Sequence, residues 1–552
     1  MFKTKLLFAF FTIIFILILI KLFYIQILTA HFSPNDYLKT KQILPQRGKI
    51  YDRNNQPLVG NQIAYLLYAE PKKINDEKTT ALTLASIFNI DPASIEAKLD
   101  KKKDWVVIKS GINPQTKESI IDKKITGLGF EEQSKRYYPE ASLAAHLLGF
   151  VGKNEKGEDI GYFGLEGFYN KDLSGLPGLI NSERDLNNRP IFVGTQEKIE
   201  PEDGRDLVLT IDKSVQNIIK KKLLAGIERY QAKQGCIIVA DPYSMAILGL
   251  VCLPDFDLDQ YYLFNEEFFK NPAISNLYEP GSIFKPIIMA AAIDNKVVEP
   301  DDFYDEEGPI KIGDSSIKTW NDKYEGKISM TRILEKSSNV GMVYIGQKLG
   351  EKKIFETLEK FGFGQLTGID LQGEVAGFIK PKKDWYPIDF ATVTFGQGIA
   401  VTPIQMIRAF AAVINGGYLY RPYLVSHLLS DGKEQIIKPK IERKILSEKT
   451  SQILIKMLVS TIENGETSWI KPPGYKIGGK TGTAQIPIQG HYDPTKTTAS
   501  FIGFAPAENP KFIALVMLKE PQTSPWGSET AAPIFFDIAN ELLIYYNIAP
   551  EQ

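Results

Sequence analysis

Three short stretches decide the fold of this 552-residue chain: EPGSIFKP at residues 279–286, KSSNVG at residues 336–341 and GGKTGT at residues 478–483. They contain a serine three residues before a lysine, then S-x-N, then K-T-G, in that order along the chain. None of the three is specific alone, because serine-x-x-lysine recurs at 315–318, 430–433 and 468–471, and S-x-N at 33–35. The ordered set is therefore the informative feature.

The stretch around Ser282 differs from the other serine-x-x-lysine stretches in its flanking residues. Pro280 and Gly281 end the preceding segment, and the almost entirely apolar run at 283–293 predicts a helix buried on all sides. Residues three apart share a helix face, so we expect the Lys285 amine beside the Ser282 hydroxyl. Pro286 fits only the first turn of a helix, which places Ser282 at the helix N-terminus. The alternative is a plain serine cap on a core helix.

The three motifs together suggest nucleophilic chemistry. A serine hydroxyl such as that of Ser282 attacks well only when a neighbouring group takes its proton. Lys285 can take it only as a neutral amine, and burial together with a nearby cation such as Lys480 lowers a lysine pKa from its usual value of about 10.4. We expect Ser337, in a loop between two helical stretches, to relay the proton. We expect Asn339 to hold a substrate amide and the Lys285 amine.

The K-T-G motif lies in a segment that is predicted to be an edge strand. Gly482 lets another backbone approach closely, so an extended peptide can add to this edge as a further strand. Lys480 and the hydroxyls of Thr481 and Thr483 are expected to bind the terminal carboxylate of that peptide. The N–H groups of Thr483 and Ser282 are expected to form an oxyanion hole. The alternative is an ordinary edge strand whose lysine discourages aggregation.

Four further stretches complete a family pattern: RGKIYDR at 47–53, FGLEGFY at 163–169, GRDLVLTID at 204–212, and FGQG at 395–398. With the three motifs, they make the chain resemble the class B penicillin-binding proteins, the monofunctional peptidoglycan D,D-transpeptidases of the FtsI or penicillin-binding protein 2 type. The resemblance covers about residues 45–540. It implies that Ser282 attacks the D-Ala-D-Ala stem peptide, forms an acyl-enzyme and passes the acyl group to an acceptor amine, which cross-links the cell wall. It also implies covalent inhibition by penicillins.

The pattern along the chain and the resemblance together predict an α+β protein with two domains outside the membrane. Residues 32–200 are expected to form a mixed, strand-rich pedestal, the dimerisation domain of the family. Residues 205–548 are expected to form the transpeptidase domain, an antiparallel sheet with a helical lobe, as in the penicillin-binding protein and β-lactamase fold. Within it we expect helices that begin at Asp212, Thr402 and Ser447.

The N-terminus predicts a membrane anchor. Residues 6–28 form an apolar run that is long enough to cross a hydrocarbon core. Lys3 and Lys5 precede it, which predicts a cytoplasmic tail at residues 1–5 and a single-pass protein whose catalytic domain lies outside the cytoplasm. The alternative is a cleaved signal peptide, but the run is long and no small-x-small cleavage site comes after it.

Composition narrows the possible partners and cofactors. The formal net charge of −1 argues against a nucleic-acid partner. The four histidines are scattered and no metal or nucleotide motif occurs, so neither a metal nor a cofactor is expected. The two cysteines, Cys236 and Cys252, are equidistant from Ser244 and can face each other across a hairpin. A disulfide is permitted outside the cytoplasm, but we expect two buried thiols.

Several functions remain open. A D,D-carboxypeptidase or β-lactamase shares the serine chemistry and transfers the acyl group to water. A non-catalytic β-lactam sensor and a division scaffold also stay open. The resemblance favours a septal division enzyme over an elongation enzyme. Its implied partners are stem peptides, β-lactams, the membrane, a SEDS-type glycosyltransferase and other division or elongation proteins.

Overall fold

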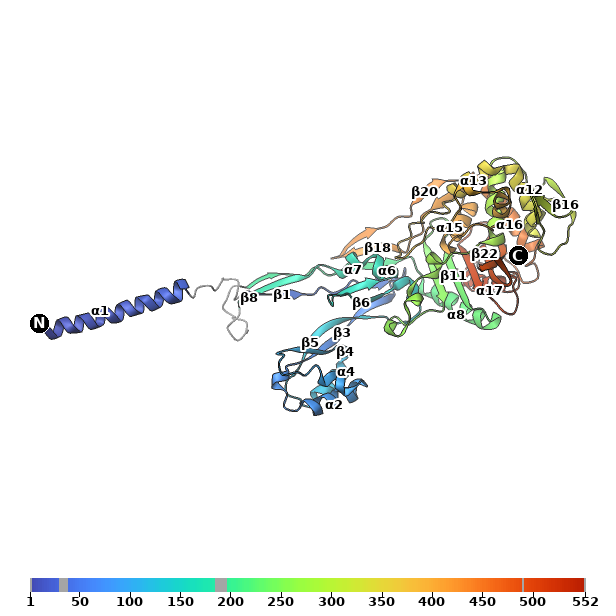
Figure 1. Ribbon diagram of the computed structural model, residues 1–552. Coiled ribbons are helices and arrows are strands. Elements are labelled where there is room, and N and C mark those ends of the chain that lie inside the picture. The colour runs from blue at the N-terminus through green and yellow to red at the C-terminus, as the bar shows by residue number, and fades with distance from the viewer. Residues whose placement is uncertain (1, 29–37, 184–195, 489–490, 551–552) are drawn as a thin grey trace. The chain divides into compact units, whose positions relative to one another are not determined.

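A computed structural model gives the structure of the chain and describes residues 2–28, 38–183, 196–488 and 491–550 (Figure 1). These residues form two compact units. One comprises Met1–Gly48 and Ser174–Gly204, and the other comprises Lys49–Leu173 and Arg205–Gln552. The expected start of the pedestal at residue 32 lies outside the described residues. The boundaries expected at residues 28, 200 and 205 stay predictions.

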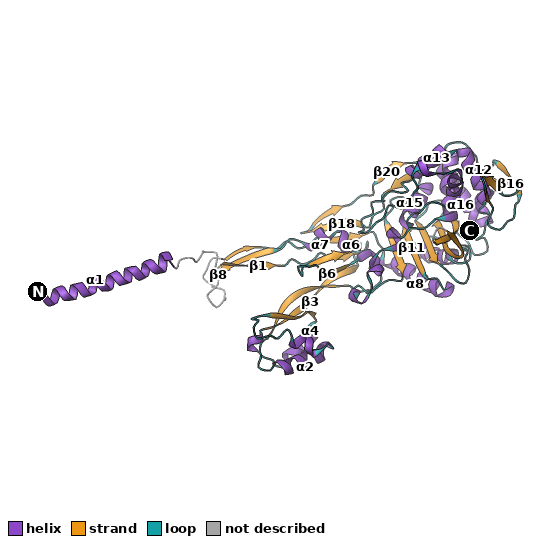
Figure 2. Cartoon of the chain, in the orientation of Figure 1, coloured by secondary structure: helices purple, strands orange, loops and turns teal. Residues whose placement is uncertain are grey.

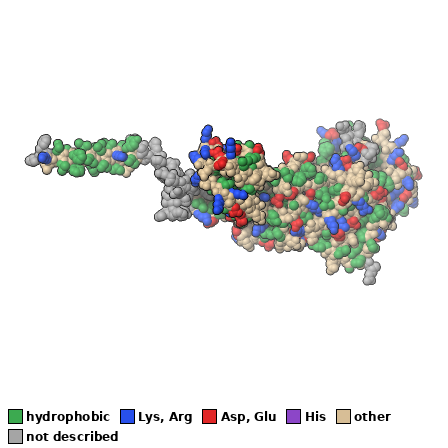
Figure 3. All heavy atoms as spheres, turned by 90° about the horizontal axis from the view of Figure 1, so that it is seen from below, with side chains coloured by type: hydrophobic (Ala, Val, Ile, Leu, Met, Phe, Trp, Pro, Cys, Tyr) green, Lys and Arg blue, Asp and Glu red, His purple; other side chains and the backbone are tan. Residues whose placement is uncertain are grey.

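The first unit contains the N-terminal helix α1 (Phe2–Phe23), which continues as a π-helical turn at Tyr24–Leu28. By length and composition, the helical segment Lys3–Ile27 can cross a membrane. Figure 3 shows hydrophobic side chains along this helix, with basic side chains near each end. It therefore fits a single-pass membrane anchor. The unit also holds an antiparallel sheet in the order β1 (Leu38–Ile43), β8 (Gly178–Glu183) and β9 (Gln196–Ile199).

The second unit contains a seven-stranded sheet with strands from distant parts of the chain. Its order is β19-β18-β10-β2-β3-β4, with β5 also paired to β3. β10 lies parallel to β2 and antiparallel to β18, so strands from both sides of residue 205 share one sheet. The strands are β2 (Ile50–Tyr51), β3 (Pro57–Ala69), β4 (Val106–Ile112), β5 (Leu128–Tyr137), β10 (Asp206–Leu209), β18 (Val425–Ser430) and β19 (Lys433–Ile436).

The RGKIYDR stretch gains a physical explanation at Asp52, which is fully buried. Its carboxylate accepts hydrogen bonds from the backbone N–H groups of Asn54 and Gln56, both at 2.8 Å, and of Lys213, at 3.1 Å. A buried carboxylate needs such donors. Asp52 thus ties the turn after β2 to the start of helix α8 (Lys213–Tyr230).

An antiparallel sheet of five strands lies in the C-terminal part of the second unit, among helices α8, α15 (Pro403–Ile414) and α16 (Glu448–Asn464) (Figure 2). Its order is β12-β11-β23-β22-β21, which places the K-T-G strand β21 at the edge, as predicted. The strands are β11 (Gln234–Ala240), β12 (Ile247–Leu253), β21 (Gly478–Ile488), β22 (His491–Ala505) and β23 (Phe512–Lys519).

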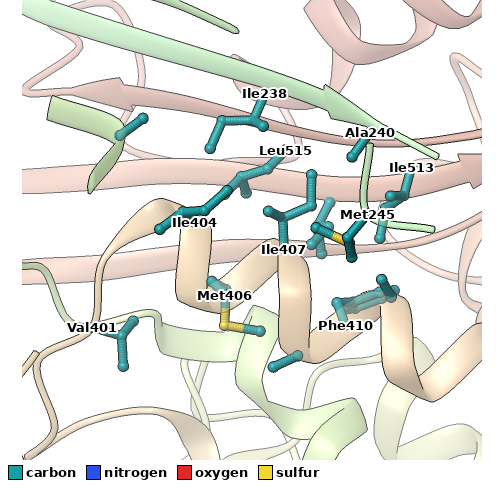
Figure 4. Packing of buried hydrophobic residues seen from close by; sticks show 14 of the residues in the cluster. Ile238, Ala240, Met245, Val401, Ile404, Met406, Ile407, Phe410, Ile513 and Leu515 are labelled. Atoms are coloured by element: carbon teal, nitrogen blue, oxygen red, sulfur yellow. The ribbon is translucent and has the colours of Figure 1, made fainter. Parts of the chain in front are cut away.

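Helices cover both faces of this sheet. α8 and α17 (Ala531–Tyr545) pack against one face, where Val215 and Phe535 join a cluster with Ile237. On the other face lies α15 (Pro403–Ile414), all of whose residues are buried. Figure 4 shows Ile404 and Ile407 of α15 facing Ile238 and Leu515 of the sheet. Burial of apolar side chains on both faces of the sheet is the main stabilising contribution here.

The predicted helix starts are confirmed. Asp212, Thr402 and Ser447 cap α8, α15 and α16 (Glu448–Asn464), each through its side chain, and Thr402 forms a capping box with Gln405. The other helices of the lobe are α10 (Lys285–Asp294), α11 (Met330–Glu335), α12 (Asn339–Leu349), α13 (Glu351–Lys360) and α14 (Pro387–Thr392).

The remaining helices and strands complete the two units. The helices are α2 (Glu77–Phe88), α3 (Pro92–Glu96), α4 (Pro114–Ile121), α5 (Ala145–Leu148), α6 (Gly164–Phe168), α7 (Asn170–Ser174) and α9 (Pro272–Ser275). The strands are β6 (Phe150–Lys153), β7 (Asp159–Tyr162), β13 (Phe303–Glu306), β14 (Ile310–Ile312), β15 (Ser315–Ile317), β16 (Gly326–Ser329), β17 (Tyr418–Tyr420) and β20 (Ile441–Lys444).

The expectation of two thiols at Cys236 and Cys252 is wrong. The β11–β12 hairpin pairs these residues directly, and the structure joins them in a disulfide. Directly opposed positions on an antiparallel pair bring their Cβ atoms close together, which is the physical reason why the bond can form.

Candidate active site

Ser282 lies in the 3₁₀ turn Gly281–Phe284, immediately before α10. The FGQG loop packs against this turn through two glycines. Gly281 has a φ of +58°, and its N–H donates a 3.0 Å hydrogen bond to the carbonyl of Gly396. Gly396 has a φ of +79°, and a Cβ there would lie 2.2 Å from the carbonyl oxygen of Gly281. Only glycine permits this approach, which explains the FGQG motif.

The K-T-G strand packs against the same turn. A Cβ at Gly281 would lie 3.0 Å from the carbonyl oxygen of Thr483, and a Cβ at Gly482 would lie 2.9 Å from Cγ2 of Ile283. The turn that carries Ser282 therefore contacts both the FGQG loop and the edge strand. The structure brings the first and third motifs together as the sequence predicted.

Lys285 is fully buried and makes three hydrogen bonds to the second motif. Its Nζ lies 2.5 Å from the carbonyl oxygen of Ser337, 3.1 Å from Ser337 Oγ and 2.9 Å from Oδ1 of Asn339. Among the described residues no hydrogen bond joins the hydroxyl of Ser282, which is half-buried, to Lys285. The amine lies where Asn339 was expected to hold it, and its polar contacts are with Ser337 and Asn339.

The loop that carries Ser337 is held in an uncommon conformation. Ser337 has a φ of +58°, in the left-handed region that costs a non-glycine residue free energy. The next residue, Ser338, caps α12 and donates a hydrogen bond to Glu306, whose side chain is fully buried. Glu306 also pairs with Lys336 at 2.8 Å. No signal in the sequence pointed to Glu306, because it lies on β13, distant along the chain from the motif.

Lys480, from the K-T-G strand, also contacts the hydroxyl of Ser337. Its Nζ lies 3.1 Å from Ser337 Oγ, 3.1 Å from Thr481 Oγ1 and 3.2 Å from the carbonyl oxygen of Thr481. Burial lowers the pKa of Lys285 well below its ordinary value, and the positive charge of Lys480 lowers it further. Burial also lowers the pKa of Lys480, while the carboxylate of Glu466 opposes that shift. Two buried amines thus share one serine oxygen.

The threonine hydroxyls of the K-T-G strand have partners inside the protein. Thr481 Oγ1 donates a 2.8 Å hydrogen bond to Oε2 of Glu466. Thr483 Oγ1 accepts a 3.0 Å hydrogen bond from the N–H of Gly527, so its own proton is available for another acceptor. Neither Glu466 nor Gly527 lies in a recognisable motif, and sequence reasoning missed both. The expected roles of these threonines toward a substrate stay predictions.

Two tryptophans lie near the motifs and were also missed. The ring centroids of Trp320 and Trp526 are 5.1 Å apart. Trp320 Nε1 donates to the carbonyl of Lys336, in the S-x-N stretch, at 3.3 Å. Trp526 precedes Gly527, which contacts Thr483. The pair therefore joins the second motif to the loop beside the third.

A cavity of about 630 Å³ lies beside these motifs, on the side of the K-T-G strand toward its C-terminal end. Its lining includes Tyr278, Glu279, Gly398 and Gln485. The hydroxyl of Tyr278 is buried and has no hydrogen-bond partner among the described residues. None of the predicted catalytic side chains lines the cavity. Among the residues that the structure describes, no group of three or more His, Cys, Asp or Glu side chains could hold a metal ion.

Comparisons with known proteins agree with this geometry. The description "Penicillin binding protein transpeptidase domain" matches residues 235–540, and "Penicillin-binding Protein dimerisation domain" matches residues 42–209. The chain is 32% identical to Stage V sporulation protein D of Bacillus subtilis, over 98% of this chain and 85% of that protein. It is 33% identical to the "Peptidoglycan D,D-transpeptidase FtsI homolog" of Mesostigma viride, over 97% of this chain and 94% of that protein.

A solved structure extends the similarity to the fold. Penicillin Binding Protein 2X from Streptococcus thermophilus aligns with a TM-score of 0.76 at 26% identity, covering 93% of this chain and 80% of that chain. The predicted α+β fold, with a transpeptidase domain that follows a dimerisation domain, is confirmed. The chain therefore belongs to the penicillin-binding protein transpeptidase family.

Proposed function

We propose that this protein is a peptidoglycan D,D-transpeptidase that works through an acyl-enzyme on Ser282. The observation that carries the proposal is the contact of two buried lysines, Lys285 and Lys480, with the single oxygen of Ser337. Such an arrangement can accept a proton from a serine and return it to a leaving group. The relative from Mesostigma viride carries the name of this activity.

In the first half of the reaction, Ser282 Oγ attacks the carbonyl carbon between the two D-alanines of a stem peptide. Its proton passes to the neutral amine of Lys285, whose pKa is lowered by burial. The C–N bond then breaks, and the nitrogen of the departing D-alanine takes a proton through Ser337. An ester on Ser282 remains. A β-lactam follows the same path, except that its opened ring stays attached.

The edge strand β21 supports the proposed binding of an extended peptide. An edge strand offers backbone groups to a further strand. The N–H groups of Ser282 and Thr483 would then stabilise the negative oxygen of the transition state. The hydroxyl proton of Thr483 is available for the terminal carboxylate, because this hydroxyl accepts its present hydrogen bond from Gly527.

In the second half, an acceptor amine attacks the ester carbonyl, and the proton that it loses returns to Ser282 by the same route. A D,D-carboxypeptidase would use water at this step. The match of residues 42–209 to a dimerisation domain supports the synthetic enzyme over the hydrolase.

The location and partners belong to the same proposal. The N-terminus is cytoplasmic, because Lys3 and Lys5 precede the apolar helix, and the catalytic domain lies outside the cytoplasm. There it works in septal division with a SEDS-type glycosyltransferase and other division proteins. β-Lactams are its covalent inhibitors.

The test is a transfer assay with the full-length protein in detergent micelles. A thioester analogue of the stem peptide is supplied with and without D-alanine as acceptor. The proposal predicts that the acyl group is transferred to D-alanine and that the rate of hydrolysis falls as the rate of this transfer rises. Equal rates of hydrolysis with and without acceptor, and no transfer, would favour the hydrolase. No turnover and no covalent penicillin adduct would favour a sensor or a scaffold.

A further inference from the structure

A carboxylate that belongs to none of the motifs stands at one end of the hydrogen-bonded chain through the site. Glu466 comes two residues after the end of α16. Its Oε2 accepts from Thr481 Oγ1 at 2.8 Å, and Thr481 Oγ1 accepts from Lys480 Nζ at 3.1 Å. Lys480 continues to Ser337 Oγ, and Ser337 to Lys285, each at 3.1 Å. One threonine hydroxyl therefore separates the Glu466 carboxylate from the lysine pair.

The cavity that Glu466 borders on the side of the K-T-G strand is too small for a substrate group. A cavity of about 10 Å³ lies between Glu466 and Thr461 of the α16 region and Gly479, Lys480 and Thr481 of the K-T-G strand. A single water needs roughly 10–15 Å³ measured in this way. The hydroxyl of Thr461 donates to the carbonyl of Gly479, which holds the strand against α16. Glu466 is half-buried, borders this small cavity together with Lys480, and is placed to act on the protein itself.

Other carboxylates near the pair already have cationic partners. Glu466 and, less strongly, Glu306 raise the pKa of Lys285, but Glu306 forms an ion pair with Lys336. Glu335, which borders the same small cavity, forms an ion pair with Arg332 at 3.0 Å. Within the described ranges of the chain, Glu466 forms no ion pair within 4.0 Å. Its negative charge therefore acts on the buried amines.

Two amines in contact with one hydroxyl titrate as a pair and not independently. When the pair holds one proton, that proton can reside on Lys480 or on Lys285. Only the first arrangement leaves Lys285 able to accept the Ser282 proton. A negative charge favours the ammonium form of the amine nearest to it. One hydroxyl, that of Thr481, separates Glu466 from Lys480, whereas the path to Lys285 continues through Lys480 and Ser337.

We propose that Glu466 is a positioning residue of this active site, which keeps the shared proton on Lys480 and so leaves Lys285 as the neutral amine. The inference rests on the proposed function. When Ser282 is acylated, its proton moves to Lys285 and then through Ser337 to the leaving nitrogen, so the charge on Lys480 is unchanged over the cycle. Glu466 contacts neither the nucleophile nor the substrate at any step of this cycle.

The experiment measures the second-order rate of acylation by a fluorescent penicillin from pH 5 to pH 10, with the full-length protein in detergent micelles. Glu466→Gln keeps an oxygen that can accept from Thr481 but removes the charge. The alkaline limb of the rate profile, where Lys480 loses its proton, should move to lower pH by about one unit. The maximal rate should also fall. Glu463→Gln, at an exposed residue of α16, removes the same charge and should leave the profile unchanged.

Further variants separate charge from hydrogen bonding. Glu466→Asp keeps the charge and should keep the wild-type alkaline limb even if the rate falls. A Glu466→Gln profile that superimposes on the wild type would overturn the proposal, as would an aspartate variant that shifts like the glutamine variant. If Glu466→Gln does not fold, the size-matched pair Glu466→Asp and Glu466→Asn gives the same comparison. Wild-type protein that is not acylated would instead refute the proposed function.

Discussion

The Nζ of Lys285 lies 2.9 Å from the Oδ1 of Asn339, although the two residues are 54 positions apart in the sequence. This contact fixes the orientation of a fully buried amine. Burial and the positive charge of Lys480 disfavour the ammonium form of this lysine, while its oxygen acceptors orient the amine. The contact therefore belongs to the proposed role of Lys285 as a base.

Replacing Lys285 tests whether it acts by proton transfer or by charge. Arginine keeps the positive charge but cannot lose its proton near neutral pH. We expect Lys285→Arg to reduce penicillin acylation about as far as Lys285→Ala, by roughly 100-fold or more. Stopped-flow measurement of acylation gives the rates. If Lys285→Arg retains substantial acylation, its role is electrostatic and the base is another group.

The lowered pKa of Lys285 makes acylation depend on pH. The base is neutral above its folded-state pKa, so the rate should fall as the pH decreases through that value, which lies well below 10.5. Stability should depend on the same group. Between the folded and unfolded pKa values the unfolded chain binds more protons, so stability rises with pH in this window.

Lys285→Met is the control for this effect, because it removes the titrating group at similar volume. Urea unfolding of both proteins across the window should show a shallower rise of stability with pH for the variant. Parallel curves would mean that the pKa of Lys285 is not lowered in the folded protein.

The contact between Gly396 and Gly281 predicts a strong effect of an added methyl group. Gly396→Ala would place an alanine at a φ of +79° and its Cβ 2.2 Å from a carbonyl oxygen. Gly313 has a φ of +60° with open space around it, so Gly313→Ala should cost only about 1–2 kcal/mol for the left-handed conformation. Gly396→Ala should cost roughly 1–3 kcal/mol more and slow acylation. Equal losses of stability would contradict the packing described for the serine turn.

Glu306 should stabilise the S-x-N loop. Glu306→Ala would leave the Lys336 amine, which is mostly buried, without its closest partner and would remove the acceptor of Ser338. Breaking one side of a buried ion pair costs about 3–5 kcal/mol. Chemical denaturation measures this cost. Glu307→Ala, at the exposed next residue, should change stability by less than about 0.5 kcal/mol. Similar values for both variants would show that the Glu306 contacts are unimportant.

The sequence predicted those features that local rules determine. Thr402, Pro403 and Gln405 predicted the start of α15, because a capping box is specified within four residues. The edge position of the K-T-G strand was also predicted. The expected contact of Asn339 with the Lys285 amine is present, whereas the expected position of this amine beside the Ser282 hydroxyl stays a prediction that rests on helical spacing. A spacing of three residues describes positions within one helix. It cannot predict hydrogen-bond partners, such as Ser337, that lie outside that helix.

Contacts between distant segments were not predictable in this way. Glu306 and Glu466 reach the motifs only after the chain has folded, and isolated glutamates carry no signal of their own. The bond between Cys236 and Cys252 shows a related limit. Symmetry about Ser244 indicated that the two residues could face each other, but the choice between thiols and a disulfide required the actual register of β11 and β12.

The most direct test of the central claim is the location of a penicillin adduct. Full-length protein is incubated with a labelled penicillin, digested and analysed by tandem mass spectrometry, with Ser282→Ala as the control. We expect one adduct per molecule, on Ser282, and none in the variant, whose stability should change by about 1 kcal/mol at most. An adduct on another serine, or a Ser282→Ala protein that is still acylated, would contradict the assignment of Ser282 as the nucleophile.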